Sequence, residues 1–89
     1  MILHSCDDGI NSKGTVILSD FLHKEKDGQI ISIFPNENKS GQGGAVSFPL
    51  DSKGCLKEIS PKNFVSDATF FLDGIRALLT SKPTLASEI

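Results

Sequence analysis

The sequence of 89 residues contains no tryptophan, no tyrosine and only two cysteines, and Arg76 is its single arginine. Tryptophan, tyrosine and arginine are the residues that most often anchor protein interfaces, so an interface of this chain has to rely on other side chains. The two cysteines, Cys6 and Cys55, are too few for a disulfide framework. We therefore expect both to be free thiols.

Long hydrophobic runs are also absent, and the apolar stretches are far shorter than the roughly 20 residues that a membrane-spanning helix needs. Residues 1–8 show no basic segment followed by a long apolar one, so we expect no secretion signal. The length suits one domain, and 38% hydrophobic with 22% charged residues is typical of a globular protein. We expect one soluble, cytoplasmic α+β domain over residues 1–89.

An excess of charge of one sign is missing as well. The formal net charge is −2, and the nine basic residues are scattered among eleven acidic ones. A protein that binds the phosphate backbone in general releases many counterions through clustered lysines and arginines. The composition therefore argues against such a binder.

The residue pattern predicts four to five β-strands separated by turn residues, at 2–6, 15–23, 29–34, 45–50 and 55–59. A helix is the competing interpretation of 15–23, because its apolar residues do not alternate strictly. Asp27 and Gly28 follow this segment, and an Asp-Gly pair is a strong hairpin signal. We therefore predict an antiparallel β-meander.

A single C-terminal amphipathic helix is predicted over residues 61–81, followed by an extended or loose tail. Ser60 and Pro61 are typical of a helix start, and Pro83 is typical of a helix end. Between them, apolar residues at helical spacing form one stripe, which we expect to pack on one face of the sheet. The stripe consists of Phe64, Ala68, Phe71, Leu72, Ile75, Leu78 and Leu79. One helix covers only part of such a sheet, so we expect a homodimer.

Histidine and cysteine are the first candidates for chemistry. His4 and Cys6 lie two residues apart, on one face of the first predicted strand, where a third residue such as His23 or Cys55 would complete a zinc site. The paired spacings that are typical of zinc sites do not occur. We therefore predict no metal ligand, no catalytic residue and no cofactor-binding residue.

Cys6 also suggests a nucleophile with a histidine as its base. His4 or His23 would serve as that base, and an aspartate would orient the imidazole. The candidate aspartates are Asp7, Asp8 and Asp20. A domain of this size offers little volume for a pocket with oxyanion donors, so a cysteine-dependent enzyme is our third functional hypothesis.

Two further features are candidates for contacts. Residues 39–44 are rich in glycine, but an extended segment follows them and the Gly-Lys-Ser/Thr ending of a phosphate loop is missing. We predict a flexible, exposed hairpin loop over residues 36–44, which, if it is functional, makes contacts rather than binding a nucleotide. Phe70 lies off the helical stripe, where it either anchors a partner or covers an edge of the sheet.

The leading functional prediction is a small non-enzymatic interaction protein, an adaptor or inhibitor that acts through a protein-protein surface, because no catalytic or cofactor signature is present. The alternative comes from a resemblance. A four-stranded meander followed by a helix resembles, in the order of its elements, the PUR and Whirly families of single-strand binders. This resemblance implies a single-stranded nucleic-acid-binding module in which aromatic side chains stack on bases. The candidate residues are Phe21, Phe34, Phe48, Lys39 and Lys57.

Overall fold

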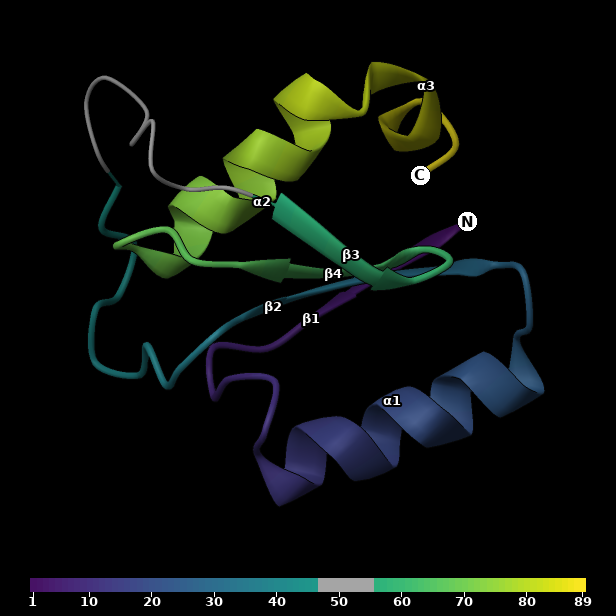
Figure 1. Cartoon of the computed structure of the whole chain (residues 1–89), viewed down its shortest axis with the longest axis horizontal. Coiled ribbons are helices and arrows are strands. Elements are labelled where there is room, and N and C mark those ends of the chain that lie inside the picture. Colours follow the sequence, from purple (N-terminus) through teal and green to yellow (C-terminus); the bar gives the residue numbers. More distant parts are fainter. Residues whose placement is uncertain (47–55) are drawn as a thin grey trace.

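The computed structural model describes residues 1–46 and 56–89 and has an α+β fold, in which a four-stranded mixed sheet lies between helices (Figure 1). The strands are β1 (Ile2–Ser5), β2 (Ile30–Pro35), β3 (Leu56–Ser60) and β4 (Asn63–Ser66). The helices are α1 (Lys13–Glu25), α2 (Phe71–Ser81) and α3 (Pro83–Ala86). None of the described helices is long and apolar enough to cross a membrane.

The sheet has the order β1-β2-β4-β3, with β1, β2 and β4 mutually parallel and β3 antiparallel to β4. The prediction of an antiparallel meander was therefore wrong. Helix α1 covers one face of the sheet and α2 the other, as Figure 1 shows. The prediction of a single helix on a single face was wrong as well.

The prediction of a strand at 15–23 was wrong, because these residues are part of helix α1. A helix was the competing interpretation of this segment. Parallel strands such as β1 and β2 cannot be joined by a tight hairpin, because the chain has to cross back over the sheet, and a helix supplies that crossover. Gly28 adopts the positive φ of 77° that the Asp-Gly signal indicated. It does so in the turn from α1 to β2, where the Gln29 N–H donates to the Lys26 carbonyl oxygen at 2.8 Å.

Strand β2 forms the centre of the fold, and all six of its residues are buried. Ile31 and Ile33 point to the α2 face, where they form the core with Phe64 of β4 and Leu78 of α2. Alternate side chains of a strand point to opposite faces. Ile30, Ser32 and Phe34 therefore point to the α1 face.

The predicted helix start at Ser60 and Pro61 is instead the turn of a β-hairpin between β3 and β4. Lys62 has a φ of 63° in this turn, a conformation that excludes a right-handed helix there. Phe64, expected on the helix, is a buried residue of β4, and β4 pairs with both β2 and β3. Residues 64 and 68 have the spacing of a helix face, but the pairing of β4 with β2 and β3 places Phe64 in a strand. No local sequence pattern shows this pairing.

Helix α2 begins at Phe71, ten residues later than predicted, and ends at Ser81 before Pro83 as predicted. Of the expected stripe, Leu78 is buried and Leu79 is 43% exposed, while three members are half-buried. These three are Phe71, Leu72 and Ile75. The tail is not extended, because residues 83–86 form α3 and Leu85 packs against the core.

The remaining predictions concern the segment before β3. Ala45 and Val46 belong to no strand, and residues 47–50 of the strand predicted at 45–50, together with Cys55, lie outside the described residues. Strand β3 confirms the predicted strand at 55–59 from Leu56 onward. Residues 36–44 form turns and bends, as predicted for this loop.

Candidate functional site

Helix α1 turns polar side chains toward the sheet and apolar side chains toward the surface. Thr15 is its single buried residue, and Ser19 and His23 are half-buried beside it. In contrast, Ile17 is 68% exposed and Phe21 is 58% exposed. A helix that covers a sheet normally places its apolar stripe inward. The reversed arrangement makes both sides of α1 candidates for function.

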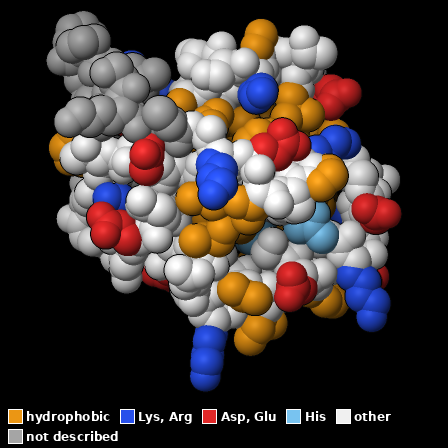
Figure 2. Space-filling model, in the orientation of Figure 1, with side chains coloured by type: hydrophobic (Ala, Val, Ile, Leu, Met, Phe, Trp, Pro, Cys, Tyr) orange, Lys and Arg blue, Asp and Glu red, His pale blue; other side chains and the backbone are white. Residues whose placement is uncertain are grey.

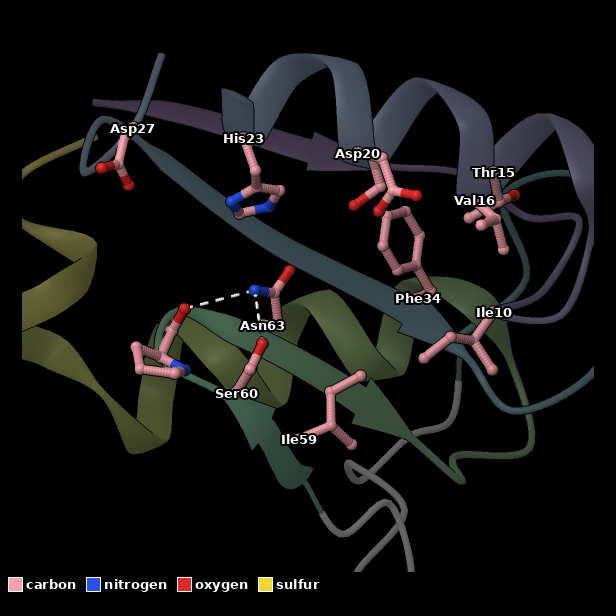
Figure 3. Close-up of a pocket in the computed structure, with 12 residues that line it drawn as sticks. Ile10, Thr15, Val16, Asp20, His23, Asp27, Phe34, Ile59, Ser60 and Asn63 are labelled. Carbon is pink, nitrogen blue, oxygen red and sulfur yellow. Dashed lines mark hydrogen bonds between the residues drawn. The ribbon is translucent and has the colours of Figure 1, made fainter. Parts of the chain in front are cut away.

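A cleft of about 480 Å³ separates α1 from the β3–β4 hairpin. Figure 3 shows Asp20 and His23 on the α1 wall with Asp27 beyond the helix end, and Ser60 and Asn63 on the opposite wall. Apolar side chains line the cleft between these walls. They are Ile10, Val16, Phe34 and Ile59. The volume lies within the range of about 300 to 1,000 Å³ that is typical of small-ligand pockets.

Three polar side chains, His4, His23 and Ser32, lie between α1 and the sheet. His23 Nε2 and Ser32 Oγ are 2.8 Å apart and share a hydrogen bond. The ring of His4 contacts Phe34 edge-on, with centroids 5.1 Å apart and an interplanar angle of 82°. Burial lowers the pKa of His4 below its usual 6.5, and the nearby His23 lowers it further. His4 is therefore a neutral imidazole near pH 7, and its Nδ1 has no hydrogen-bond partner among the described residues.

The outer face of α1 carries four exposed apolar residues. They are Val16, Ile17, Leu18 and Phe21. Figure 2 shows hydrophobic side chains at the surface on the side of the molecule that α1 forms. Single exposed apolar residues are ordinary on protein surfaces, whereas neighbouring ones on a single helix mark an interaction surface.

This apolar surface leans toward strand β1. Successive helix residues are about 100° apart, so Leu18 and Leu22 lie on the flank opposite to Asp20 and His23, which border the cleft. The cleft faces the β3–β4 side of the sheet, and β1 is the strand at the other end of the sheet. The apolar flank of α1 therefore lies on the β1 side.

Strand β1 is an open edge within the described part of the chain, because it pairs with β2 alone. The Ile2 N–H donates to the Gln29 carbonyl oxygen at 2.7 Å, on the β2 side, so the backbone groups of Leu3 point toward the open edge. The Ile2 side chain points to the same face as His4, the face that α1 covers, and it is 46% exposed. We call the β1 edge together with Ile2, Ile17, Leu18 and Phe21 the β1–α1 surface, and Val16 is left out because it lines the cleft.

The residues proposed for zinc or nucleophilic chemistry fall into two separate groups, the two histidines and the group around Cys6. Cys6 lies at the end of β1, where its Sγ donates to Asp8 Oδ2 at 3.5 Å. Cys6, Asp7 and Asp8 place ligand atoms within 4.8 Å of one another, and no histidine belongs to this group among the described residues. His4 and His23 lie instead on the α1 face of the sheet. Cys55, the other candidate ligand, lies outside the described residues.

The loop at 36–44 is tied to two distant elements. The Lys39 N–H donates to the Asp7 carbonyl oxygen at 2.7 Å, and Ser40 Oγ donates to Asp8 Oδ1 at 3.1 Å. Gln42 Oε1 accepts the Phe71 N–H at 3.1 Å and thereby caps α2. In this fold the loop is hydrogen-bonded both to the segment that follows β1 and to the start of α2. A phosphate loop leads directly into a helix, and in the described residues no helix follows this loop directly.

The aromatic residues proposed for base stacking do not share an exposed face. Phe21 is exposed on α1, Phe34 is 4% exposed beneath α1, and Phe48 lies outside the described residues. Phe70 is half-buried immediately before α2. The mixed sheet with helices on both faces also removes the element order on which the resemblance to the PUR and Whirly families depended.

The cleft was missed by sequence reasoning, although a signal for one wall was present. Val16, Asp20, His23 and Asp27 follow one another at steps of four, three and four residues, which is the spacing of one helix flank. The opposite wall carried no comparable signal, because Ser60 and Pro61 are typical of a helix start and Asn63 falls within the helix predicted over residues 61–81. Comparison of the chain with models of protein families, with curated proteins and with solved structures finds no significant match.

Proposed function

We propose that this chain is a small non-enzymatic interaction module that binds another polypeptide through the β1–α1 surface. The observation that carries the proposal is the orientation of α1, which presents Ile17, Leu18 and Phe21 to the surface while Thr15 and Ser19 face the sheet. Exposing these apolar side chains in water is unfavourable, and burying a leucine or phenylalanine side chain fully contributes about 1.5 to 3 kcal/mol.

The open edge of β1 gives the partner a second way to bind. Parallel strands are normally buried within a sheet, with helices over both faces, whereas β1 has one unpaired side among the described residues. A partner strand laid beside β1 would satisfy its free N–H and C=O groups. A helix attached to that strand would then cover Leu18 and Phe21.

We propose a second copy of this chain as the first partner to test. Two copies related by a two-fold axis would each supply an open β1 edge and an apolar flank, so one surface meets its own equivalent. The exposed residues of the surface are predominantly apolar, so bringing two copies together entails little repulsion between like charges.

The test changes one exposed leucine of the surface. We expect the wild-type protein to be a dimer in light scattering and Leu18→Glu to be a monomer, because the glutamate would be buried without a partner in the interface. The dissociation constant of any remaining dimer of the variant should be at least about tenfold higher than that of the wild-type dimer. A factor of ten corresponds to about 1.4 kcal/mol.

Leu79→Glu is the matched control. Leu79 is 43% exposed on α2, against 47% for Leu18 on α1, and the two helices cover opposite faces of the sheet. The control should remain a dimer. A wild-type protein that stays monomeric at every concentration, or a Leu79→Glu variant that dissociates as readily as Leu18→Glu, would contradict self-association through the β1–α1 surface.

A further inference from the structure

We propose that the cleft between α1 and the β3–β4 hairpin binds a small organic cation, an ammonium or amidinium group attached to an apolar body. This inference is independent of the proposed function, because the cleft and the β1–α1 surface lie on opposite flanks of α1. It depends on the charge, the hydrogen-bonding groups and the apolar lining of the cleft.

The carboxylates that line the cleft are the first observation. Asp20 and Asp27 both line it, and none of the described residues that line it is a lysine or arginine. Neither carboxylate forms a hydrogen bond or an ion pair with another described residue. Two carboxylates along one side of a cleft favour a cation over a neutral or anionic ligand, because low-dielectric walls concentrate their field.

The hydrogen-bonding groups of the opposite wall also favour a donor. The Asn63 Nδ2 group donates to Ser60 Oγ at 2.7 Å and to the Pro61 carbonyl oxygen at 3.2 Å. These bonds occupy the donors of the amide and orient its oxygen toward α1, as Figure 3 shows. The Asn63 oxygen is thereby placed as an acceptor that faces the acidic wall across the cleft.

A buried hydroxyl without a partner also belongs to the cleft. Thr15 lines it, is 4% exposed, and its Oγ1 has no hydrogen-bond partner among the described residues. An unpaired buried hydroxyl is unfavourable, because it has lost its hydrogen bonds to water without replacing them. A ligand or a water molecule that reaches Thr15 would remove that cost.

The lining between the two walls defines the rest of the ligand. Phe34 and Ile59 come from the sheet, and Val16 comes from α1. These side chains favour an apolar group next to the charged one. Benzylamine, which is protonated at neutral pH, combines both features and serves as the probe.

The experiment is a titration of the labelled protein followed by two-dimensional amide NMR, with benzylamine and two matched compounds that carry the same ring. Benzyl alcohol lacks the charge, and phenylacetate reverses it. We expect saturable shifts for benzylamine at the amides of Asp20, His23 and Asn63. Benzyl alcohol should bind about threefold to tenfold more weakly, and phenylacetate more weakly still, because each of the two partly exposed carboxylates contributes about 0.2 to 1 kcal/mol as an ion pair.

The double variant Asp20→Asn, Asp27→Asn should weaken benzylamine binding by about threefold to tenfold and leave benzyl alcohol unchanged. Glu25→Gln, on α1 but outside the cleft lining, is the control that should retain the wild-type affinity. The dispersion of the amide spectrum verifies that each variant is folded. Equal binding of the three compounds, unchanged benzylamine affinity in the double variant, or shifts confined to residues outside the cleft would each overturn the assignment.

Discussion

His4 illustrates how a single residue can carry more information in the structure than in the sequence. In the sequence it was a possible metal ligand or base beside Cys6. In the fold it is 9% exposed under α1, next to Phe34 and Ser32, and it does not belong to the group that Cys6 forms with two aspartates. Burial in this apolar and hydroxyl-containing setting disfavours its charged form.

This burial predicts how stability depends on pH. The unfolded chain binds a proton at His4 near the usual pKa of 6.5, whereas the folded chain has a lower pKa at this residue. Between these two pKa values the unfolded state binds more protons, so the free energy of unfolding falls as the pH falls below about 6.5. Urea denaturation of the wild type at a series of pH values should show this loss.

The variant His4→Gln isolates the contribution of His4. It should be less stable than the wild type at pH 7 because of the changed packing, but its free energy of unfolding should fall less steeply between pH 7 and 5. Identical slopes for wild type and variant in this range would mean that His4 is not kept neutral by the fold.

At the scale of elements, the packing of α2 on β4 depends on a glycine in the middle of the helix. A Cβ atom at Gly74 would lie 2.7 Å from Ser66 Oγ and 2.8 Å from Ser66 Cβ. Ser66 is a buried residue of β4, and its Oγ accepts the Ala68 N–H at 3.1 Å. The glycine therefore allows the helix to approach the strand closely.

We expect Gly74→Ala to destabilise the protein by about 1 to 2 kcal/mol. Overpacking of a core costs about 1 to 3 kcal/mol, and the better helix propensity of alanine recovers up to about 1 kcal/mol. Overpacking prevails, because the atom that has to move is attached to a paired strand. The midpoint of urea denaturation measures the difference.

Gly14→Ala in α1 is the matched comparison for this prediction. A Cβ atom at Gly14 would meet nothing within 4 Å, so this variant should be as stable as the wild type or more stable by up to about 1 kcal/mol. If Gly74→Ala stabilised the protein as Gly14→Ala does, α2 would not pack as closely on β4 as the structure has it.

At the scale of the whole molecule, the uneven distribution of apolar residues between the two faces is the main feature. On the α2 face, Ile31, Ile33, Phe64 and Leu78 form the buried core. On the α1 face, the helix contributes mainly small and polar groups to the contact with the sheet, and its apolar residues are exposed. Association that buries them would therefore stabilise the fold itself.

Thermal unfolding tests this link between association and folding. If the folded chain associates through the β1–α1 surface, mass action should raise the melting temperature of the wild type as the protein concentration increases. The melting temperature of Leu18→Glu should depend less on concentration. If the melting temperature of the wild type is the same at all protein concentrations, association does not stabilise the fold.

Local sequence features by themselves determined several parts of this protein. The β-branched run at 30–34 became the buried strand β2, Pro83 ended α2, and Gly28 adopted a positive φ in the turn that the Asp-Gly pair indicated. These features depend on neighbours in the chain, through side-chain branching, the missing proline N–H and the absence of a Cβ atom. The α+β class follows from the same local signals.

The tertiary structure alone decided the direction of the strands, the position of α1 and the cleft. Residues 15–23 suit a strand or a helix locally, and the parallel pairing of β1 with β2 selects the helix. Asn63–Ser66 has to pair with β2 and β3 before Phe64 can join the core, a contact between residues about 30 positions apart. The cleft arises where two such distant segments, α1 and the β3–β4 hairpin, face each other, because a local pattern specifies the faces of each element and not their partners.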